Sequence, residues 1–324
     1  MKVEGSVAVV TGASSGIARA TALGFAKRGA SVVVAARSKD SLDDVVRECE
    51  AEGAEALAVP TDVADEEAVQ ELARRAAERF GRIDVWVNAA AVILYGEFEK
   101  TPSEAYRRVI ETNLFGQIHG ARAVLPYFRE RSRGVLVNVA SVWGSVSSPY
   151  VSAYVVSKHG VRAFSESLQE ALWLERKTRD IHVCTILPQC VDTPIFRHAG
   201  NYTHRTPKTV PPVADPDRVV RAVLRSVEHP RRQRTVGAFA LFLELGHAVM
   251  PSLYSHLVPR VMNLMAFSSD EAEPGPGNIF EPMPEWNKVD GEWRRGDLRA
   301  LLAGGGTGVL AAGAAGALWW RRRR

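Results

Sequence analysis

The stretch Val7–Arg28 constrains the fold most, because it joins an apolar run, a glycine-rich turn and a helical pattern. Val7–Val10 are all apolar, as in a strand of a parallel sheet that is covered on both faces. The turn Thr11-Gly-Ala-Ser-Ser-Gly-Ile-Ala follows, and apolar residues then recur with helical spacing. This order brings backbone N–H groups to a helix N-terminus, where a pyrophosphate binds. The alternative is an ordinary strand-to-helix turn, because a glycine motif alone is a weak signal.

Further apolar runs alternate with amphipathic helical patterns along the next 180 or so residues. These runs are Ala30–Ala36, Ala54–Val59, Asp84–Val87, Gly134–Val139 and Ile181–Leu187. The alternation predicts stacked βαβ units, and therefore an α/β fold with a doubly wound parallel sheet of the Rossmann type. Ligands of such sheets bind beyond the carboxyl ends of the strands. The residues that follow the runs are therefore expected at one edge: Gly12, Arg37, Asp62, Asn88, Ser141 and Pro188.

Arg37 follows the second predicted strand, where a dinucleotide fold meets the adenosine ribose. An acidic residue there would hold the 2′-hydroxyl of NAD, whereas an arginine accommodates the 2′-phosphate of NADP. This chain has Ala36 followed by Arg37, with Lys39 two positions further on. Arginine binds phosphate bidentately, so NADP(H) is favoured over NAD(H). The alternative is a solvated arginine at a strand end.

Tyr154 and Lys158 stand four residues apart in a predicted helix, Tyr154–Leu174, and Ser141 lies upstream. Residues at this spacing share one face of a helix. A neighbouring ammonium favours the phenolate and is expected to lower the pKa of the tyrosine from about 10. Such a phenol serves as a proton donor near neutral pH. Alone the pair is equally typical of a solvated lysine beside a half-buried tyrosine.

Charge and cysteine content narrow the function classes. The formal net charge is +4, but seven basic residues and one acidic residue lie from Arg294 onward, so residues 1–293 carry −2. The basic character therefore belongs to the tail and does not indicate a nucleic-acid-binding face. The three cysteines are Cys49, Cys184 and Cys190. Their odd number and spacing predict neither a disulfide framework nor a metal site, and Met1–Gly5 has no secretory leader, so we expect a reducing, cytoplasmic compartment.

Taken together, the motifs resemble those of the short-chain dehydrogenase/reductase family, closely over residues 5–195 and less specifically to about 240. Their joint order and spacing are specific, although each motif alone is weak. The matching pieces are Thr11-Gly-Ala-Ser-Ser-Gly, Asp62-Val, Val87-Asn-Ala-Ala, Glu111-Thr-Asn-Leu-Phe-Gly, Val137-Asn-Val-Ala-Ser, Tyr154-x-x-x-Lys158 and Pro188-x-x-Val-Asp-Thr.

The resemblance implies a role for each matching residue. Tyr154 is the implied general acid/base, Lys158 holds the nicotinamide ribose and lowers the tyrosine pKa, and Ser141 polarises the substrate oxygen. Asn113 supports a water chain that reaches Lys158. The implied cofactor-binding residues are Gly12, Ser14, Ser15, Gly16, Ile17, Arg37, Asp62, Val63, Asn88, Tyr154, Lys158, Pro188, Val191 and Thr193. Asp62 and Val63 would contact adenine, and Val191 and Thr193 the carboxamide. A homo-oligomer is also implied.

Four positions depart from the family pattern. Ala18 stands where a third glycine is usual, Ala89 and Ala91 replace an asparagine and a glycine, and Gln189 replaces a glycine. None of these changes removes a catalytic group. They put the geometry of cofactor binding in question more than the reaction.

We divide the chain into three parts. Residues 1–267 form the catalytic domain, with a substrate lid at about 192–216. The apolar segments at 233–245 and 250–267 are expected to pack in the core or cover an apolar pocket, and a membrane-contacting face is the alternative. Residues 268–298 are rich in Pro, Gly and acidic side chains and read as a linker or a wrapped arm. Residues 299–324 form an extension with a basic end.

The extension contains 21 uncharged residues, Ala300–Trp320, flanked by arginines. This length can span a bilayer, and Trp319 and Trp320 suit a membrane interface. Because the stretch is mostly Ala and Gly, its tendency to insert is weak, and a flexible tail is the alternative. We expect membrane contact through residues 300–320.

The sequence therefore predicts an NADP(H)-dependent oxidoreductase that interconverts an alcohol and a ketone or aldehyde on an apolar substrate, at the cytoplasmic face of a membrane. The alternative is a membrane-associated NADP(H)-binding scaffold or sensor with little turnover. Retention of Ser141, Tyr154, Lys158 and Asn113 favours the enzyme.

Overall fold

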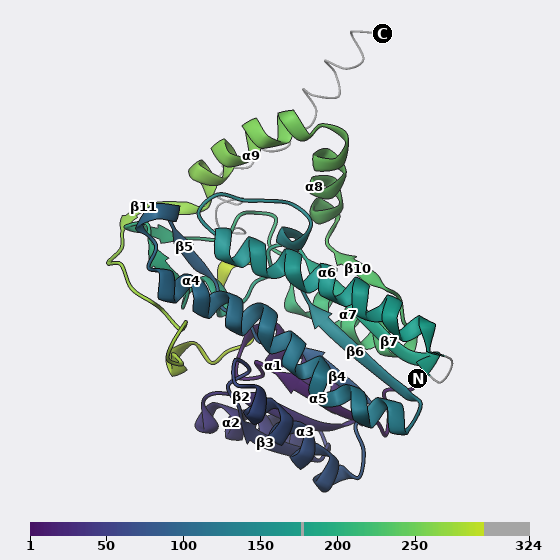
Figure 1. Ribbon diagram of the computed structural model, residues 1–324. Coiled ribbons are helices and arrows are strands. Elements are labelled where there is room, and N and C mark those ends of the chain that lie inside the picture. The colour runs from purple at the N-terminus through teal and green to yellow at the C-terminus, as the bar shows by residue number, and fades with distance from the viewer. Residues whose placement is uncertain (176–177, 295–324) are drawn as a thin grey trace. The chain divides into compact units, whose positions relative to one another are not determined.

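Seven parallel strands form the central sheet of the computed structural model, which describes residues 1–175 and 178–294 (Figure 1). The strand order is β10-β7-β6-β4-β1-β2-β3. The strands are β1 (Val7–Thr11), β2 (Ser31–Ala36), β3 (Ala56–Pro60), β4 (Val85–Asn88), β6 (Arg133–Val139), β7 (Asp180–Pro188) and β10 (Gln233–Val236). This arrangement confirms the doubly wound parallel sheet and its six predicted strands. The edge strand β10 was not predicted.

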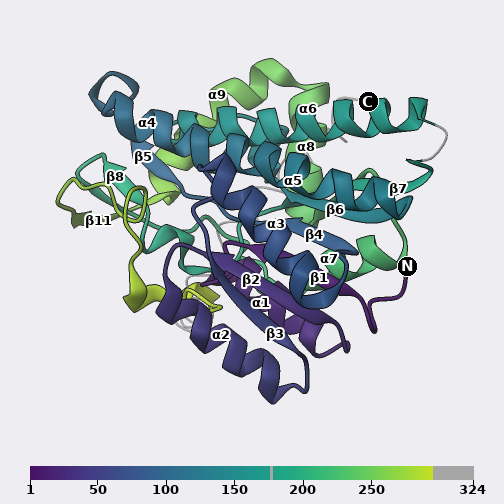
Figure 2. The same cartoon turned by 60° about the horizontal axis from the view of Figure 1, so that its bottom comes forward.

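Helices cover both faces of the sheet, so that each central strand is buried on both sides. Helices α1 (Gly16–Ala26), α2 (Lys39–Ala51) and α7 (Pro216–Glu228) pack with Ala8 and Val10 of β1. Helices α3 (Glu66–Phe80), α5 (Gly116–Glu130) and α6 (Ser152–Leu174) pack with Val9 on the opposite face. Figures 1 and 2 show α5 and α6 side by side across that face. The alternation of Ala8, Val9 and Val10 between two cores explains why the run is apolar throughout.

The helical region predicted from Thr101 to Arg133 consists of three consecutive segments. Helix α4 (Ser103–Ile110) leads into a π-helical segment, Glu111–Phe115, and then into α5. A π segment adds a residue to the helical repeat and often marks a functional position. Here it carries the predicted site residue Asn113.

Two separate two-stranded sheets and a helix pair lie outside the seven-stranded sheet. Strand β5 (Leu94–Gly96) pairs with β8 (Gly200–Tyr202), and β9 (Arg205–Pro207) pairs with β11 (Phe267–Glu271). The predicted lid, 192–216, therefore contains two short strands. Helices α8 (Ala238–Val249) and α9 (Pro251–Met265) stand between β10 and β11. Figure 1 shows α8 and α9 at the end of the fold that lies farthest from α2 and α3.

After β11 the chain continues as an irregular segment, 272–291, which we call the arm. The compact unit that contains the sheet extends from Met1 to Gly291, so the arm is part of it. Figures 1 and 2 show the arm, in yellow-green, running from β11 toward the end of the sheet that carries α2.

Within residues 1–175 and 178–294, no helix combines the length and the apolar character needed to cross a membrane. The predicted membrane segment, 300–320, lies outside the described residues.

Candidate active site

The nucleotide turn between β1 and α1 approaches the β4 loop very closely. Gly12 has a φ of +75°, and a Cβ built on it would lie 2.6 Å from Cα of Ala90. Thr11 Oγ1 accepts hydrogen bonds from the backbone N–H groups of Ala89 (3.2 Å) and Ala90 (3.4 Å). These contacts join the two loops, and a glycine is required at the point of closest approach.

The N-terminus of α1 lines a cavity, and the N–H of its first residue, Gly16, donates to the carbonyl of Lys288 at 2.8 Å. Its N-cap, Ser15, makes no side-chain capping bond, and no acidic residue stands in the first turn. Gly12, Ser14, Ser15, Gly16 and Ile17, which are predicted to bind the cofactor, all line one cavity. Unpaired helical N–H groups and the helix dipole favour an anion there.

Arg37 and Asp62 lie at the ends of β2 and β3 and line the same cavity. Asp62 accepts a bond from the backbone N–H of Ala64 (3.0 Å) and pairs with Arg108. Arg37 donates to the main-chain carbonyls of three arm residues, Asn278, Ile279 and Phe280. Burial lowers the pKa of Arg37, and Asp62 opposes that effect.

The three predicted catalytic side chains converge at the other end of the cavity. Ser141 follows β6 and its Oγ accepts a bond from the backbone N–H of Trp143 (3.2 Å). Tyr154 and Lys158 lie one turn apart on α6, with Lys158 Nζ 5.4 Å from the centre of the tyrosine ring. Lys158 Nζ donates to the carbonyl of Val139 at 2.9 Å, which directs the ammonium beneath the end of β6. All three side chains line the cavity.

Burial dominates the titration of this group. Desolvation lowers the pKa of Lys158 to about 7. Desolvation also raises the pKa of Tyr154, although its hydrogen bond with Ser141 acts in the opposite direction. The expected lowering of the tyrosine pKa by Lys158 is therefore not found in this structure. The physical reason is that both groups lose water, which disfavours phenolate and ammonium alike.

Two predicted site residues, Asn88 and Asn113, do not line the cavity. Asn88 is buried and bonds to the carbonyl of Gln117 (3.0 Å), to Asn138 Oδ1 (2.9 Å) and to the indole of Trp86 (2.8 Å). The amide of Asn88 is therefore used inside the protein, and its expected place beside the cofactor stays a prediction. Asn113 exchanges two bonds with the main chain of Val92 (2.8 and 2.9 Å) and donates to Ser157 Oγ (3.1 Å). Asn113 therefore fixes the loop after β4 through Val92, which lines the cavity.

The remaining predicted residues, Val63, Pro188, Val191 and Thr193, line the cavity. Gly16 packs against Thr193, whose Cβ would lie 3.3 Å from an added Cβ. Gln189, one of the departures from the family pattern, donates to the carbonyl of Pro212 at 2.8 Å and packs on Gly237. The altered residue thus links the lid to the start of α8.

Sequence reasoning missed two sets of cavity residues. One is an apolar wall around the catalytic group, made of Ile93, Tyr95, Trp143, Ile195, Phe196, Val210, Phe239, Leu243 and Met262. The Trp143 ring meets Tyr154 edge to face, with 5.9 Å between centroids. The other set lies on the arm: Asn278, Pro282, Met283 and Asn287. The apolar 233–267 region contains Phe239, Leu243 and Met262 of the first set, whereas no motif marks its other six residues or the second set.

The residues present fit a dinucleotide. The cradle at Gly12 and Gly16 suits close backbone approach, and α1 offers donors to an anion. Arg37 supplies a guanidinium at the end of β2, and Lys158 with Tyr154 lies at the opposite end. No group of three or more His, Cys, Asp or Glu side chains in the described part of the chain could hold a metal ion.

Comparisons with known proteins agree with this geometry. The sequence profile described as "short chain dehydrogenase" matches residues 6–202. An uncharacterized oxidoreductase of Bacillus subtilis, YxnA, is 34% identical over 84% of this chain and 75% of its own length. The 3-oxoacyl-[acyl-carrier-protein] reductase FabG of Thermotoga maritima is 33% identical over 60% of this chain and 78% of its own.

Solved structures show the same fold. A short-chain dehydrogenase from Streptomyces avermitilis has a TM-score of 0.67 and 30% identity, covering 78% of this chain and 96% of that one. An alcohol dehydrogenase from the archaeon Thermococcus sibiricus, in complex with 5-hydroxy-NADP, has a TM-score of 0.63 and 27% identity, covering 72% of this chain and 96% of that one.

Proposed function

Because this chain belongs to the short-chain dehydrogenase family and is an NAD(P)-dependent dehydrogenase/reductase, we propose that it interconverts an alcohol and a ketone or aldehyde on an apolar substrate, with NADP(H) as cofactor. The observation that carries this proposal is the single cavity shared by Arg37, the α1 N-terminus, Ser141, Tyr154 and Lys158. One end of it suits an adenosine phosphate, and the other holds a proton donor.

The chain's own residues act on the oxygen of the substrate. NADP(H) supplies or accepts the hydride when bound. The hydroxyls of Ser141 and Tyr154 face the same cavity, so both can hydrogen-bond one carbonyl oxygen. Tyr154 then transfers a proton to that oxygen as negative charge develops, and Ser141 stabilises the charge with a fixed donor. In alcohol oxidation the phenolate form of Tyr154 takes up the proton of the alcohol and becomes the phenol.

Lys158 controls the charge around Tyr154. Its ammonium is 1% exposed and is held by the carbonyl of Val139. With a pKa of about 7 it gains or loses a proton near neutrality. The charged form favours the phenolate and so opposes the desolvation that raises the pKa of Tyr154 in this structure.

The apolar substrate class rests on the wall around the catalytic group. Ile93, Trp143 and Met262 contribute to a hydrophobic cluster with Tyr154. Such a wall contributes apolar area that a hydrocarbon substrate can bury, while Ser141 and Tyr154 fix one oxygen.

NADPH turnover with a panel of apolar ketones and aldehydes tests the reaction. Tyr154→Phe should lower kcat by at least about 100-fold because the proton donor is lost. Tyr127→Phe, on α5 away from the cavity, is the matched control and should leave kcat unchanged. Equal turnover by Tyr154→Phe and the native enzyme would sink the mechanism.

The cofactor preference has its own test. Arg37→Gln should weaken NADPH binding about tenfold or more, because a charge-assisted contact with phosphate is lost. NADH binding should change less. Titration calorimetry that finds equal affinities for NADH and NADPH, both insensitive to Arg37→Gln, would remove the preference.

We further propose that the catalytic domain is held at the cytoplasmic face of a membrane through residues 300–320. A second apolar surface supports membrane contact: Phe242, Leu245, Val249, Leu253, Leu257 and Leu264 of α8 and α9 are exposed. Fractionation of cells that express the full chain or a chain ending at residue 297 tests this. Full-length protein found entirely outside the membrane fraction refutes it.

Light scattering on the purified chain tests the homo-oligomer that the family resemblance implies.

A further inference from the structure

The arm crosses the end of the cavity that suits the adenosine half of a dinucleotide. Its first part is fastened to the lid: Gly275 and Asn201 exchange two backbone bonds (2.8 and 2.9 Å), and the N–H of Asn278 donates to the carbonyl of His198 at 2.9 Å. Ile279 is fully buried against Leu94 and Val92. At the far end the N–H of Gly291 donates to Asp192 at 3.1 Å. The arm is thus fixed at both ends.

Between these ends the arm engages Arg37. The guanidinium donates to the carbonyls of Phe280 (2.6 Å), Asn278 (2.6 Å) and Ile279 (3.2 Å). These acceptors lie where the family resemblance places a 2′-phosphate. Three donor contacts that a phosphate would use are therefore made to neutral main-chain oxygens.

The arm engages the α1 N-terminus in the same way. The N–H of Gly16 donates to the carbonyl of Lys288 at 2.8 Å. Arg19, also in α1, donates to the carbonyl of Asn287 at 2.5 Å and forms an ion pair with Glu48. The amide of Asn287 donates to Ser41 Oγ at the start of α2. The carbonyl of Lys288 thus accepts from an N–H group at the N-terminus of α1, where a pyrophosphate is predicted to bind.

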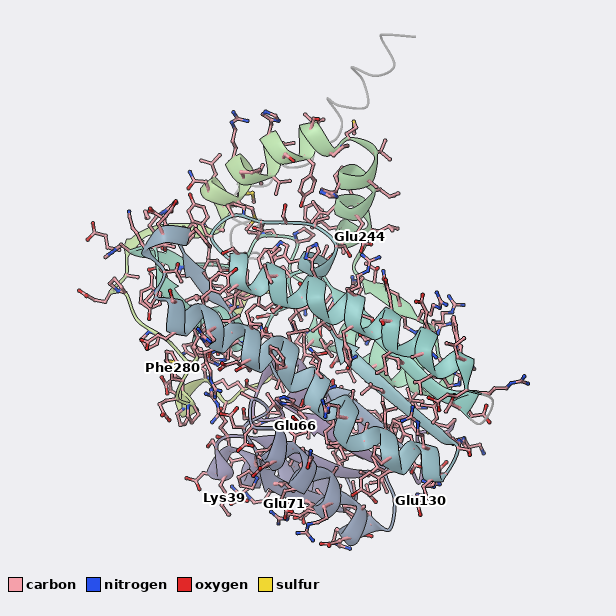
Figure 3. The ribbon with its side chains drawn as sticks, in the orientation of Figure 1. Lys39, Glu66, Glu71, Glu130, Glu244 and Phe280 are labelled. Carbon is pink, nitrogen blue, oxygen red and sulfur yellow. The ribbon has the colours of Figure 1, made fainter. Side chains whose placement is uncertain are left out.

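We propose that residues 280–288 are a gate on the cofactor site that competes with NADP(H) for the N-terminus of α1 and for the Arg37 contact that the carbonyl of Phe280 holds. The inference rests on the proposed function, because it concerns the same site. Phe280, Glu281, Pro282, Pro284 and Glu285 are exposed, whereas Ile279 and Gly291 are buried. The proposed movement is confined to the exposed stretch between these two buried anchors, on which Phe280 is labelled in Figure 3.

Exchange of partners explains how the gate opens. A phosphate bears a full negative charge, and its hydrogen bonds to a guanidinium are roughly twice as strong as bonds to a neutral carbonyl. A phosphate of NADP(H) therefore replaces the Phe280 carbonyl at Arg37 with a gain in free energy. The apparent affinity is reduced by the fraction of molecules with the arm closed, and association is limited by opening.

A reversible lock tests the gate. Ser41→Cys and Asn287→Cys place two thiols where the native side chains are in hydrogen-bond contact, so oxidation can join the arm to α2. NADPH binding is measured by its fluorescence in a stopped-flow instrument, with no substrate present. The oxidised double variant should lose NADPH binding at least tenfold and recover it on reduction. Each single variant, oxidised in parallel, is the control for Cys49, Cys184 and Cys190.

A second variant loosens the arm without a disulfide. Trp286→Ala with Asn287→Ala removes the contact of Trp286 with Arg197 and the bond to Ser41. At high NADPH concentration the observed rate of binding is limited by opening of the arm. This limiting rate should rise roughly fivefold or more, as the loss of one hydrogen bond implies. Glu273→Gln, on an exposed part of the arm, should behave as the native chain.

The outcomes separate the two proposals. If the reduced lock binds NADPH and the oxidised lock binds it equally well, or if loosening the arm leaves the association rate unchanged, the gate is refuted and the proposed function stands. If neither the native nor the reduced chain binds NADPH, the cofactor assignment itself fails, and the gate fails with it.

Discussion

The ammonium group of Lys158 is enclosed by protein, and this has a measurable consequence for stability. Its pKa is about 7 in the folded chain against 10.5 for an exposed lysine. The unfolded chain therefore binds one more proton between these values, and stability rises as the pH increases from 7 toward 10.5. Lys158→Met lacks this slope. The free energy of unfolding of Lys158→Met, relative to that of the native chain, should therefore fall by about 3 kcal/mol between pH 7 and pH 9.5, because one pKa unit corresponds to about 1.4 kcal/mol.

Urea unfolding at the two pH values measures this difference. Lys27→Met, at an exposed position, should show no comparable change with pH. If the difference in unfolding free energy between Lys158→Met and the native chain does not change with pH, the lowered pKa of the buried Lys158 is contradicted. Loss of turnover in Lys158→Met is expected in either case and decides nothing about stability.

Gly12 allows the effect of close approach to be separated from that of a left-handed backbone. Gly12 and Gly53 have similar φ values, +75° and +84°, but only Gly12 has backbone atoms of a neighbouring loop within 3 Å of an added Cβ. Gly53→Ala should cost about 1 kcal/mol from backbone strain. Gly12→Ala should cost a further 1–3 kcal/mol from the clash with Ala90 and should weaken NADPH binding. If Gly12→Ala and Gly53→Ala lose the same unfolding free energy in chemical denaturation, the loop at Ala90 moves away from the added Cβ without cost.

At the residue level, the sequence predicted which side chains reach the cavity when a strand end delivers them. Arg37, Asp62, Ser141 and Pro188 were placed correctly because a parallel strand leaves its carboxyl end at a fixed edge. Asn88 follows the same rule in sequence, yet it turns inward. Strand register sets it beside Asn138, and an amide partner across the sheet satisfies it more fully than a cavity would. Local sequence does not reveal such a partner.

At the level of elements, the lid and the arm meet at His198. The imidazole is 6% exposed, and burial lowers its pKa from 6.5 to about 4. The unfolded chain takes up a proton below pH 6.5 while the folded chain resists it until about pH 4, so this part of the stability is lost as the pH falls between those values. The loss should reach about 3 kcal/mol.

Comparison of the native chain with His198→Gln isolates this contribution from that of the carboxylates. The free energy of unfolding is measured at pH 7 and pH 4.5 for both chains. The native chain should lose more stability than the variant over this interval. A parallel loss in the two chains would show that His198 stays accessible to protons when folded.

The elements differ in how far sequence could anticipate them. The six central strands and the helices between them follow from periodicity, since each buries a face set by a regular repeat. The π-helical segment at Glu111–Phe115 could not be predicted, because its helical pattern is continuous in sequence and the extra residue is stabilised by the bonds of Asn113 to Val92. The arm could not be placed either. Its contacts with Arg37, Gly16 and Arg19 are made by main-chain carbonyls, which carry no sequence signal.

For the whole molecule, the distribution of charge follows the division into compact units. Residues 292–324 contain seven arginines and two acidic residues, a net charge of +5, so residues 1–291 carry −1 out of the total of +4. The first unit, Met1–Gly291, contains the sheet, the catalytic group and the arm. The basic pI of the chain is therefore a property of its C-terminal segment.

A chain that ends at Gly291 should keep the structure and the cofactor site while losing the basic character. Its net charge of −1 predicts that it no longer binds a cation exchanger at pH 7, whereas the full chain does. Its thermal midpoint should stay within about 3 °C of that of the full chain, because each 1 kcal/mol shifts the midpoint of a chain this size by only a few degrees. NADPH affinity should also be unchanged, since Asn278–Lys288 and their partners are all retained. A chain ending at Glu271 is the matched comparison: it removes the arm as well, and it should bind NADPH faster while losing the stability that buried Ile279 provides. If the chain ending at Gly291 unfolds or loses NADPH binding, the C-terminal segment contributes to the folded unit, and the assignment of the site to residues 1–291 is wrong.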